Sequence, residues 1–214
     1  MSAAKRTSRD EQRRSLGQNF LRPELADQLV AGAAFAPGDL VVEIGAGRGV
    51  CTFSLARHGI QVIALEKDPR WAESLLREVV RRSLDDRVRV VCCDARDYRM
   101  PRRPFRAFGS LPFGATTSIL RHLLDDPSSA LVRADFVVQF AVARKRSATP
   151  PTTLLSTMWA PWWSFEMGRR LPAGAFRPVP SVDAAVLQVS RRVPPLLPLR
   201  MATAYASFVQ REWT

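Results

Sequence analysis

The segment from Ser110 to Phe113 combines groups that suit a flat base carrying an exocyclic amine. The backbone carbonyl of Leu111 and the hydroxyl of Ser110 can accept hydrogen bonds from the two amine hydrogens, which would localise the nitrogen lone pair. Pro112 fixes the turn. The ring of Phe113 offers a stacking face that stabilises positive charge on the nitrogen by roughly 0.5–2 kcal/mol. The alternative is an ordinary Pro-Phe turn with Phe113 in the core.

A glycine-rich loop upstream offers a place for a nucleotide-like cofactor. Gly45, Gly47 and Gly49 follow an apolar run and precede a helical stretch, so the backbone can turn tightly beside a ligand. Glu66 ends the next apolar run, where a carboxylate can accept both ribose hydroxyls of a nicotinamide or an adenosyl cofactor. Asp94 ends the third run and can accept from an adenine amine or cap a helix. Together with the Ser110 turn, this order predicts methyl transfer to an amino group.

Few residues are available for other chemistries. The chain has three cysteines and two histidines, and the adjacent Cys92 and Cys93 would point to opposite faces of a strand. These are too few for a metal site, a disulfide framework or a Ser/His/Asp triad. We therefore expect no metal.

The charge balance favours a polyanionic partner. Lys and Arg number 32 against 20 Asp and Glu, for a net charge of +12 and an isoelectric point near 11.1. Nucleic acid is the partner that this predicts, with a general bias toward arginine as the alternative. Arginine-rich stretches at residues 5–14, 99–106 and 144–146 can hold phosphates or form solvated faces.

No secretory or membrane segment is expected. The polar N-terminus lacks the apolar core of a signal sequence, which favours a cytoplasmic location. The uncharged run at residues 147–165 contains three prolines and several Ser and Thr, so we expect buried protein there rather than a membrane span.

The elements that must position these groups alternate between strands and helices. A predicted helix at residues 23–34 leads into the first strand, and further helices are predicted at residues 69–82 and 116–124. Such alternation is typical of a parallel doubly wound α/β sheet with helices on both faces. Two late strands can add an antiparallel edge, giving a mostly parallel seven-stranded sheet. The seven predicted strands are residues 40–44, 61–65, 88–92, 107–111, 136–140, 164–171 and 184–189.

The length of 214 residues suits one main domain with a small appendage. We expect a basic flexible arm at residues 1–14 and a catalytic domain at residues 15–192. Residues 193–214 begin with a proline-rich linker and continue as a short helical stretch, expected to be a remnant or truncated C-terminal helical segment.

The sequence resembles the ribosomal RNA adenine-N6 methyltransferases, and within them the erythromycin-resistance (Erm-type) branch. The resemblance covers about residues 16–192, and the stretches at residues 113–117 and 142–146 resemble actinobacterial members. The motifs that carry it are Leu16-Gly17-Gln18-Asn19-Phe20-Leu21, the glycine loop after Glu43, Leu65-Glu66, Asp94-Ala95, Leu111-Pro112-Phe113, and the segment from Phe176 to Val182.

The resemblance implies a Rossmann-like class I fold that uses S-adenosylmethionine. It implies that the cofactor is held as follows: Asn19 and Leu21 close over it, Gly45 and Gly47 face its methionine part, Glu66 holds the ribose, and Asp94 and Ala95 contact the adenine.

The resemblance also implies residues that hold the RNA. Ser110 borders both the cofactor and the target base, Leu111 and Phe113 receive that base, and Phe176 is a second aromatic wall or a hydrophobic anchor. RNA phosphates would be held by Arg144, Lys145 and Arg146.

The activity implied is methylation of adenine N6 in 23S ribosomal RNA by a monomer, before or during ribosome assembly, conferring macrolide resistance. One departure concerns Ser110, because the family usually has Asn there and the serine oxygen lies further from the amine. Two alternatives stay open: an adenine-N6 DNA methyltransferase, and a catalytically silent protein that binds RNA or assists ribosome assembly.

Overall fold

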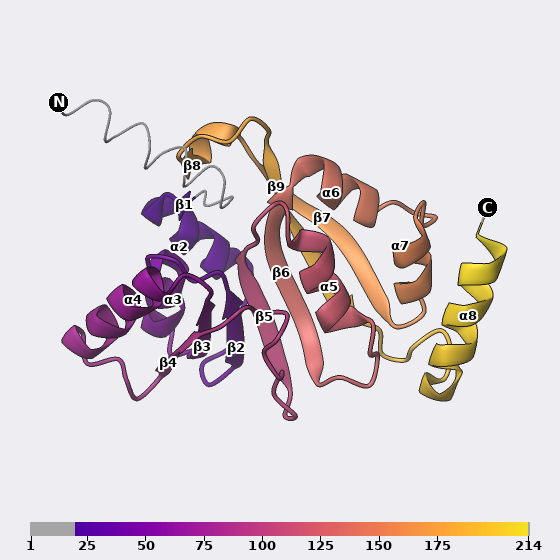
Figure 1. The fold of residues 1–214 in the computed structure, drawn as a ribbon, viewed down its shortest axis with the longest axis horizontal. Coiled ribbons are helices and arrows are strands. Elements are labelled where there is room, and N and C mark those ends of the chain that lie inside the picture. Colours follow the sequence, from indigo (N-terminus) through magenta and orange to yellow (C-terminus); the bar gives the residue numbers. More distant parts are fainter. Residues whose placement is uncertain (1–19, 214) are drawn as a thin grey trace.

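Seven strands form the central sheet of residues 20–213, the part of the chain that this computed structural model describes (Figure 1). The predicted basic arm and Asn19 lie outside these residues. The order is β4-β3-β2-β5-β6-β9-β7, and all strands run parallel except β9. The strands are β2 (Leu40–Ile44), β3 (Gln61–Glu66), β4 (Val88–Cys92), β5 (Phe105–Ser110), β6 (Leu131–Gln139), β7 (Trp163–Leu171) and β9 (Ala184–Arg191).

This sheet confirms the predicted Rossmann-like fold, with one difference at its edge. Only β9 is antiparallel. It lies between β6 and β7 and pairs antiparallel with both, so the edge strand β7 runs parallel to the other strands. Each of the seven predicted strands overlaps an observed one. The apolar runs predict the strands well because both faces of the sheet are covered, as in β2, where every residue is buried.

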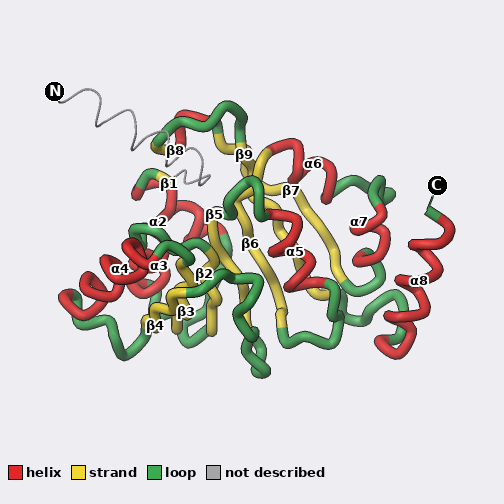
Figure 2. The backbone as a smooth tube through the Cα atoms, in the orientation of Figure 1, coloured by secondary structure: helices red, strands yellow, loops and turns green. Residues whose placement is uncertain are grey.

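Helices cover both faces (Figure 2). Side chains such as Val30, Leu55 and Leu75 place α2, α3 and α4 in one apolar layer, and Leu120, Ala143 and Trp159 place α5, α6 and α7 in the other. No helix within residues 20–213 has the length and apolar character needed to cross a membrane. The helices are α2 (Pro23–Gly32), α3 (Val50–Arg57), α4 (Pro69–Arg81), α5 (Thr116–Leu124), α6 (Phe140–Arg146), α7 (Leu154–Trp159) and α8 (Ala202–Glu212), with 3₁₀ turns η1 (Ala173–Ala175) and η2 (Leu199–Met201).

A small second sheet joins two family-like segments that are far apart in sequence. The strand β1 (Phe20–Leu21) pairs antiparallel with β8 (Phe176–Arg177), with Leu21 opposite Phe176. Both of these side chains are buried in the layer under α2. The pairing brings the last two residues of the N-terminal motif, Phe20 and Leu21, beside the proline-stiffened segment that precedes β9.

The C-terminal segment packs back on the α7 side of the molecule (Figure 1). Trp162 donates its indole N–H to the Leu197 carbonyl at 3.1 Å, and Tyr205 of α8 donates its hydroxyl to the Thr157 carbonyl at 3.2 Å. The Trp162 and Tyr205 rings meet edge to face. The division into arm, catalytic domain and C-terminal segment stays a prediction.

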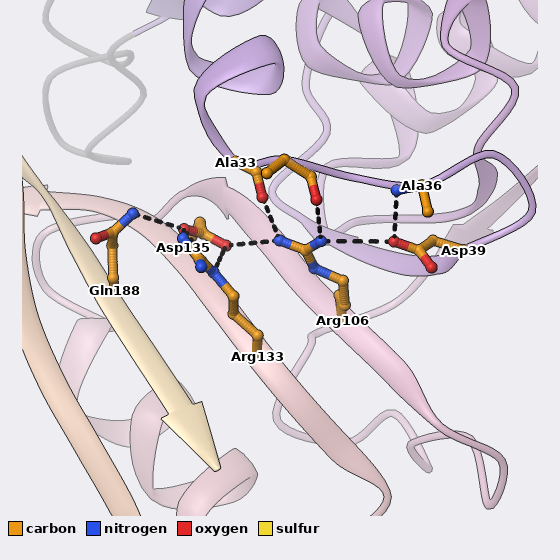
Figure 3. Close-up of polar contacts among 8 residues, drawn as sticks. Ala33, Ala36, Asp39, Arg106, Arg133, Asp135 and Gln188 are labelled. Carbon is orange, nitrogen blue, oxygen red and sulfur yellow. Dashed lines mark hydrogen bonds and ion pairs between the residues drawn. The ribbon is translucent and has the colours of Figure 1, made fainter. Parts of the chain in front are cut away.

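A buried polar network ties α2 to the middle of the sheet (Figure 3). Asp135 of β6 accepts from Arg133 at 2.7 and 2.9 Å and from Gln188 of β9 at 3.2 Å. Arg106 of β5 reaches Asp135 at 3.4 Å and Asp39 at 3.5 Å. Its guanidinium also donates to the carbonyls of Ala33 and Ala34, just past the end of α2, so the network fixes this helix against β5 and β6.

Candidate active site

A pocket of about 1370 Å³ opens at the carboxyl ends of β2, β3, β4 and β5. Ligands of open α/β sheets bind at this edge because the strand-to-helix loops there leave a crevice. The pocket is bordered by the glycine loop after β2, by Glu66, by Asp94 and Ala95, and by the turn from Ser110 to Phe113. The structure therefore brings together the four predicted strand-end segments.

The glycine loop is tight because its neighbours leave no room for side chains. Gly47 has φ +54°, and a Cβ there would lie 2.8 Å from Cε1 of Phe20. Gly49 has φ +79° at the start of α3, and a Cβ there would lie 2.4 Å from Leu75. These contacts pack β1 and α4 against the loop. Gly45 borders the pocket directly.

Glu66 is held by the backbone. Its carboxylate accepts from the Gly47 N–H at 2.7 Å and from the Asp68 N–H at 2.8 Å, and the residue is 7% exposed. Each carboxylate oxygen can accept more than one hydrogen bond, so the ribose role predicted for Glu66 is compatible with these contacts.

Asp94 sits among basic groups at the next strand end. It accepts from Lys67 Nζ at 2.8 Å, from the Arg96 guanidinium at 2.6 and 2.9 Å, and from the Arg96 backbone N–H. The Arg96 hydrogen bonds, aided by Lys67, hold the pKa of Asp94 well below its usual range. Ala95 beside it is buried and borders the pocket. Asp94 is thus a firmly ionised acceptor.

Glu43 is a pocket residue for which the sequence analysis assigned no role. Its side chain is 2% exposed, and its carboxyl group accepts from the Thr52 hydroxyl at 2.6 Å. Burial raises the pKa of Glu43 to about 8; the Thr52 hydrogen bond opposes this shift and the nearby Glu66 carboxylate adds to it. The signal in the sequence was an acid two positions before Gly45 at the end of an apolar run.

The turn after β5 leaves acceptors open toward the pocket. The Leu111 N–H donates to the Val137 carbonyl at 3.0 Å, and the Pro112 carbonyl accepts from Ala115 and Thr116, which leads the chain into α5. Within residues 20–213, no hydrogen bond reaches the Leu111 carbonyl or the Ser110 hydroxyl. Phe113 is half-buried at the pocket. These are the groups predicted to receive the amine.

Leu21, predicted to close over the cofactor, and Phe176, predicted to be an aromatic wall or a hydrophobic anchor, are both buried. Leu21 and Phe176 are 6% and 0% exposed, and both border the pocket from the small second sheet. Full burial favours the hydrophobic-anchor interpretation of Phe176, and its role as an aromatic wall stays a prediction.

The three basic residues of α6 differ in burial. Arg144 and Lys145 are exposed. Arg146 is 9% exposed, donates to the hydroxyls of Thr153 and Ser156 at 2.8 and 3.3 Å, and burial lowers its pKa. The prediction that Arg146 holds RNA phosphate therefore does not fit its position, because its guanidinium is turned into the protein.

The arginine-rich stretch at residues 99–106 does not face the pocket at Arg102, Arg103 and Arg106. Arg102 and Arg103 are exposed in the loop that enters the amino end of β5, opposite the pocket edge, and Arg106 belongs to the buried network. Among the described residues, no group of three His, Cys, Asp or Glu could hold a metal ion.

The whole site can be compared with known families. The family model for ribosomal RNA adenine dimethylases matches residues 9–213. The chain belongs to this family. Among curated dimethylase relatives, an rRNA adenine N-6-methyltransferase of Corynebacterium diphtheriae is 33% identical over 92% of the chain and 76% of that protein. The mycinamicin-resistance protein MyrB of Micromonospora griseorubida is 35% identical over 94% of the chain and 63% of its own length.

Solved structures of methyltransferases share the fold of this chain. The crystal structure of the 23S rRNA methyltransferase ErmE matches with a TM-score of 0.79 and 32% identity, covering 90% of this chain and 78% of that one. A dimethyladenosine transferase from Plasmodium falciparum matches with a TM-score of 0.73 at 18% identity, covering 83% and 64%, which shows the fold alone. The chain spans between about half and three quarters of the curated relatives' lengths.

Proposed function

We propose that this protein transfers methyl groups from S-adenosylmethionine to N6 of a specific adenine in 23S ribosomal RNA. The observation that carries the proposal is the open Leu111 carbonyl and Ser110 hydroxyl in the same pocket as the glycine loop, Glu66 and Asp94. Membership of the adenine dimethylase family supports the choice of an adenine amine.

The cofactor would lie across the strand ends. Asp94 and Ala95 would meet its adenine, Glu66 its ribose, and Gly45 and Gly47 its methionine part. Leu21 and Asn19 would close over it, although Asn19 lies outside the described residues. The sulfonium methyl would then point toward the turn from Ser110 to Phe113, since that turn borders the same pocket.

The reaction would be a direct in-line displacement. The adenine is turned out of its stack and lies on Phe113, and its amine hydrogens are accepted by Leu111 and Ser110. S-adenosylmethionine, when bound, would supply an electrophilic methyl group to the N6 lone pair, and its sulfur would keep the electrons of the broken carbon–sulfur bond. The amine then loses a proton to solvent, so no strong base is required. A second methyl would need a fresh cofactor.

RNA would approach the pocket edge. Arg144 and Lys145 follow the carboxyl end of β6 and are exposed, so they can hold phosphates beside the target base. The name of the 23S rRNA methyltransferase ErmE supports a 23S target, and that of the mycinamicin-resistance protein MyrB supports a role in macrolide resistance. We further propose that the protein acts in the cytoplasm as a monomer.

The test is label transfer from S-adenosylmethionine to protein-free 23S RNA, followed by nucleoside mass analysis. We expect label in N6-methyladenine or N6,N6-dimethyladenine. Glu66→Gln should lose most of the transfer, whereas Glu73→Gln, at an exposed acid of α4, should retain it. Equal labelling of duplex DNA would favour the DNA enzyme, and RNA binding without transfer would favour the silent protein.

A further inference from the structure

Arg48, in the glycine loop, borders the pocket and is held by two aromatic rings. Its guanidinium carbon lies 5.2 Å from the centre of the Phe20 ring and 5.0 Å from that of Trp71, and these rings meet edge to face at 5.4 Å. The rings come from β1 and the first turn of α4, so the cation is fixed at the junction of three elements. Rings hold a guanidinium through its faces and leave its N–H groups free for an anion.

The other basic residues of the pocket already have acidic partners. Lys67 and Arg96 pair with Asp94 at 2.8 and 2.6 Å, and Arg70 pairs with Asp68 at 2.8 Å. Arg48 has no carboxylate within 4 Å among residues 20–213. Among the basic residues of the pocket, Arg48 is therefore the one that has no acidic partner within residues 20–213.

The position of Arg48 identifies the anion. In the proposed function, the cofactor runs from adenine at Asp94 through ribose at Glu66, and its amino-acid part lies over the glycine loop. That part ends in a carboxylate, which the Glu66 carboxylate would repel. A planar guanidinium matches a carboxylate with two parallel hydrogen bonds. The start of α3, directly after Gly49, adds the positive end of a helix dipole at the same place.

We propose that Arg48 is a cofactor-binding residue that holds the carboxylate of the amino-acid part of S-adenosylmethionine, with Phe20 and Trp71 fixing its orientation. This rests on the proposed function, because it assumes that the pocket binds this cofactor. It predicts selectivity: a ligand without the carboxylate gains nothing from Arg48.

The test compares two ligands by calorimetry. S-adenosylhomocysteine carries the carboxylate, and S-adenosyl-3-thiopropylamine keeps the amine but lacks it. Arg48→Ala should weaken S-adenosylhomocysteine about 10- to 100-fold, the range for a lost charged hydrogen bond, and leave the thiopropylamine within about twofold. Arg48→Lys should recover part of the loss. The matched control, Arg77→Ala, removes an exposed arginine of α4 that is paired with Glu73 outside the pocket and should change neither affinity.

The opposite outcomes are distinct. Equal weakening of both ligands would mean that Arg48 only supports the glycine loop, and thermal melting of each variant separates this from unfolding. Unchanged affinity for both ligands with weaker RNA binding would assign Arg48 to an RNA phosphate instead. If the unmodified protein binds neither ligand, the proposed function itself fails and the carboxylate proposal fails with it; if it binds and methylates normally, only the role of Arg48 is in question.

Discussion

Asp135 and Glu43 are equally buried carboxyl groups, each 2% exposed, in different parts of the same sheet. Asp135 meets two arginines and Gln188, all from strands of the sheet (Figure 3). Glu43 meets one hydroxyl, that of Thr52, and has the Glu66 carboxylate nearby. Within residues 20–213, arginines neutralise Asp135, whereas no cation pairs with Glu43.

The difference separates polar groups that build the fold from polar groups that serve the site. A buried charge is tolerated when its partners complete its hydrogen bonds, as at Asp135. At the pocket edge, the Leu111 carbonyl and the Arg48 guanidinium are each short of a hydrogen-bonding or ionic partner within the described residues. The proposed reactants carry the complementary groups: the cofactor has a carboxylate, and the RNA has the target amine.

The largest expected effect comes from breaking the completed network. Asp135→Asn leaves Arg106 and Arg133 without their shared charge, and we expect the free energy of unfolding to fall by about 3 kcal/mol. Methyl transfer per folded molecule should stay near that of the unmodified protein, since the network lies away from the pocket. Urea titration and a transfer assay measure the two quantities.

The matched control for this change is Asp27→Asn. Asp27 pairs with Arg57 on the surface, where both side chains are more than half exposed, so its loss should cost about 0.5 kcal/mol or less. Equal destabilisation by the two variants would show that the buried network contributes no more than a surface ion pair.

The next largest effect is expected at Phe113, which borders the pocket. Phe113→Ala removes the stacking face for the base, and we expect kcat/KM for RNA to fall about 10- to 100-fold, as for loss of base stacking. The affinity for S-adenosylhomocysteine should be retained. Phe113→Tyr keeps the ring and should keep most of the rate. Phe208→Ala, at an exposed aromatic of α8, is the control and should leave the rate unchanged.

The raised pKa of Glu43 predicts how the stability of the fold depends on pH. The folded-state pKa, raised to about 8, exceeds the ordinary value near 4.5, so between these pH values the folded protein keeps a proton that the unfolded chain releases. The Glu43 contribution to stability is therefore present at low pH and is lost as the pH rises toward 8, by up to about 1.4 kcal/mol per pH unit.

Glu43→Gln should remove this loss, because a neutral amide does not titrate and can still accept from Thr52. Urea unfolding at pH 5, 6, 7 and 8 should show a flatter profile for the variant than for the unmodified protein. Parallel profiles would mean that Glu43 is ionised in the folded protein across this range.

Much of the fold could be predicted from local sequence patterns, whereas the burial of individual charged residues could not. The strands were predictable because apolar runs alternate with helical ones, and the strand-end acids came with them. Arg146 was predicted to hold RNA phosphate together with Arg144 and Lys145 because the three form one run of basic residues. Its burial depends on Thr153, Ser156 and Trp159, whose positions only the folded chain defines.

Pairing between distant segments was also beyond local reasoning. Nothing in the residues near Leu21 specifies that β1 pairs with β8, since a two-residue strand carries almost no pattern. Glu43 was seen as part of a motif, but its raised pKa depends on being enclosed between the sheet and α3. Sequence patterns predicted residues that line one pocket, and tertiary packing set the raised pKa of Glu43.

The smallest expected effect is at Ser110, where we expect a substitution to raise the rate of methyl transfer. The hydroxyl has no partner within residues 20–213 and is too short to reach an amine as an asparagine carboxamide would. Ser110→Asn should raise kcat and the dimethyladenine share by about 3- to 10-fold, the value of one neutral hydrogen bond, whereas Ser110→Ala should lower kcat by a similar or smaller factor. Single-turnover transfer with nucleoside mass analysis measures both. Equal rates for the Asn, Ser and Ala forms would leave the Leu111 carbonyl as the sole acceptor of the amine and remove Ser110 from the mechanism.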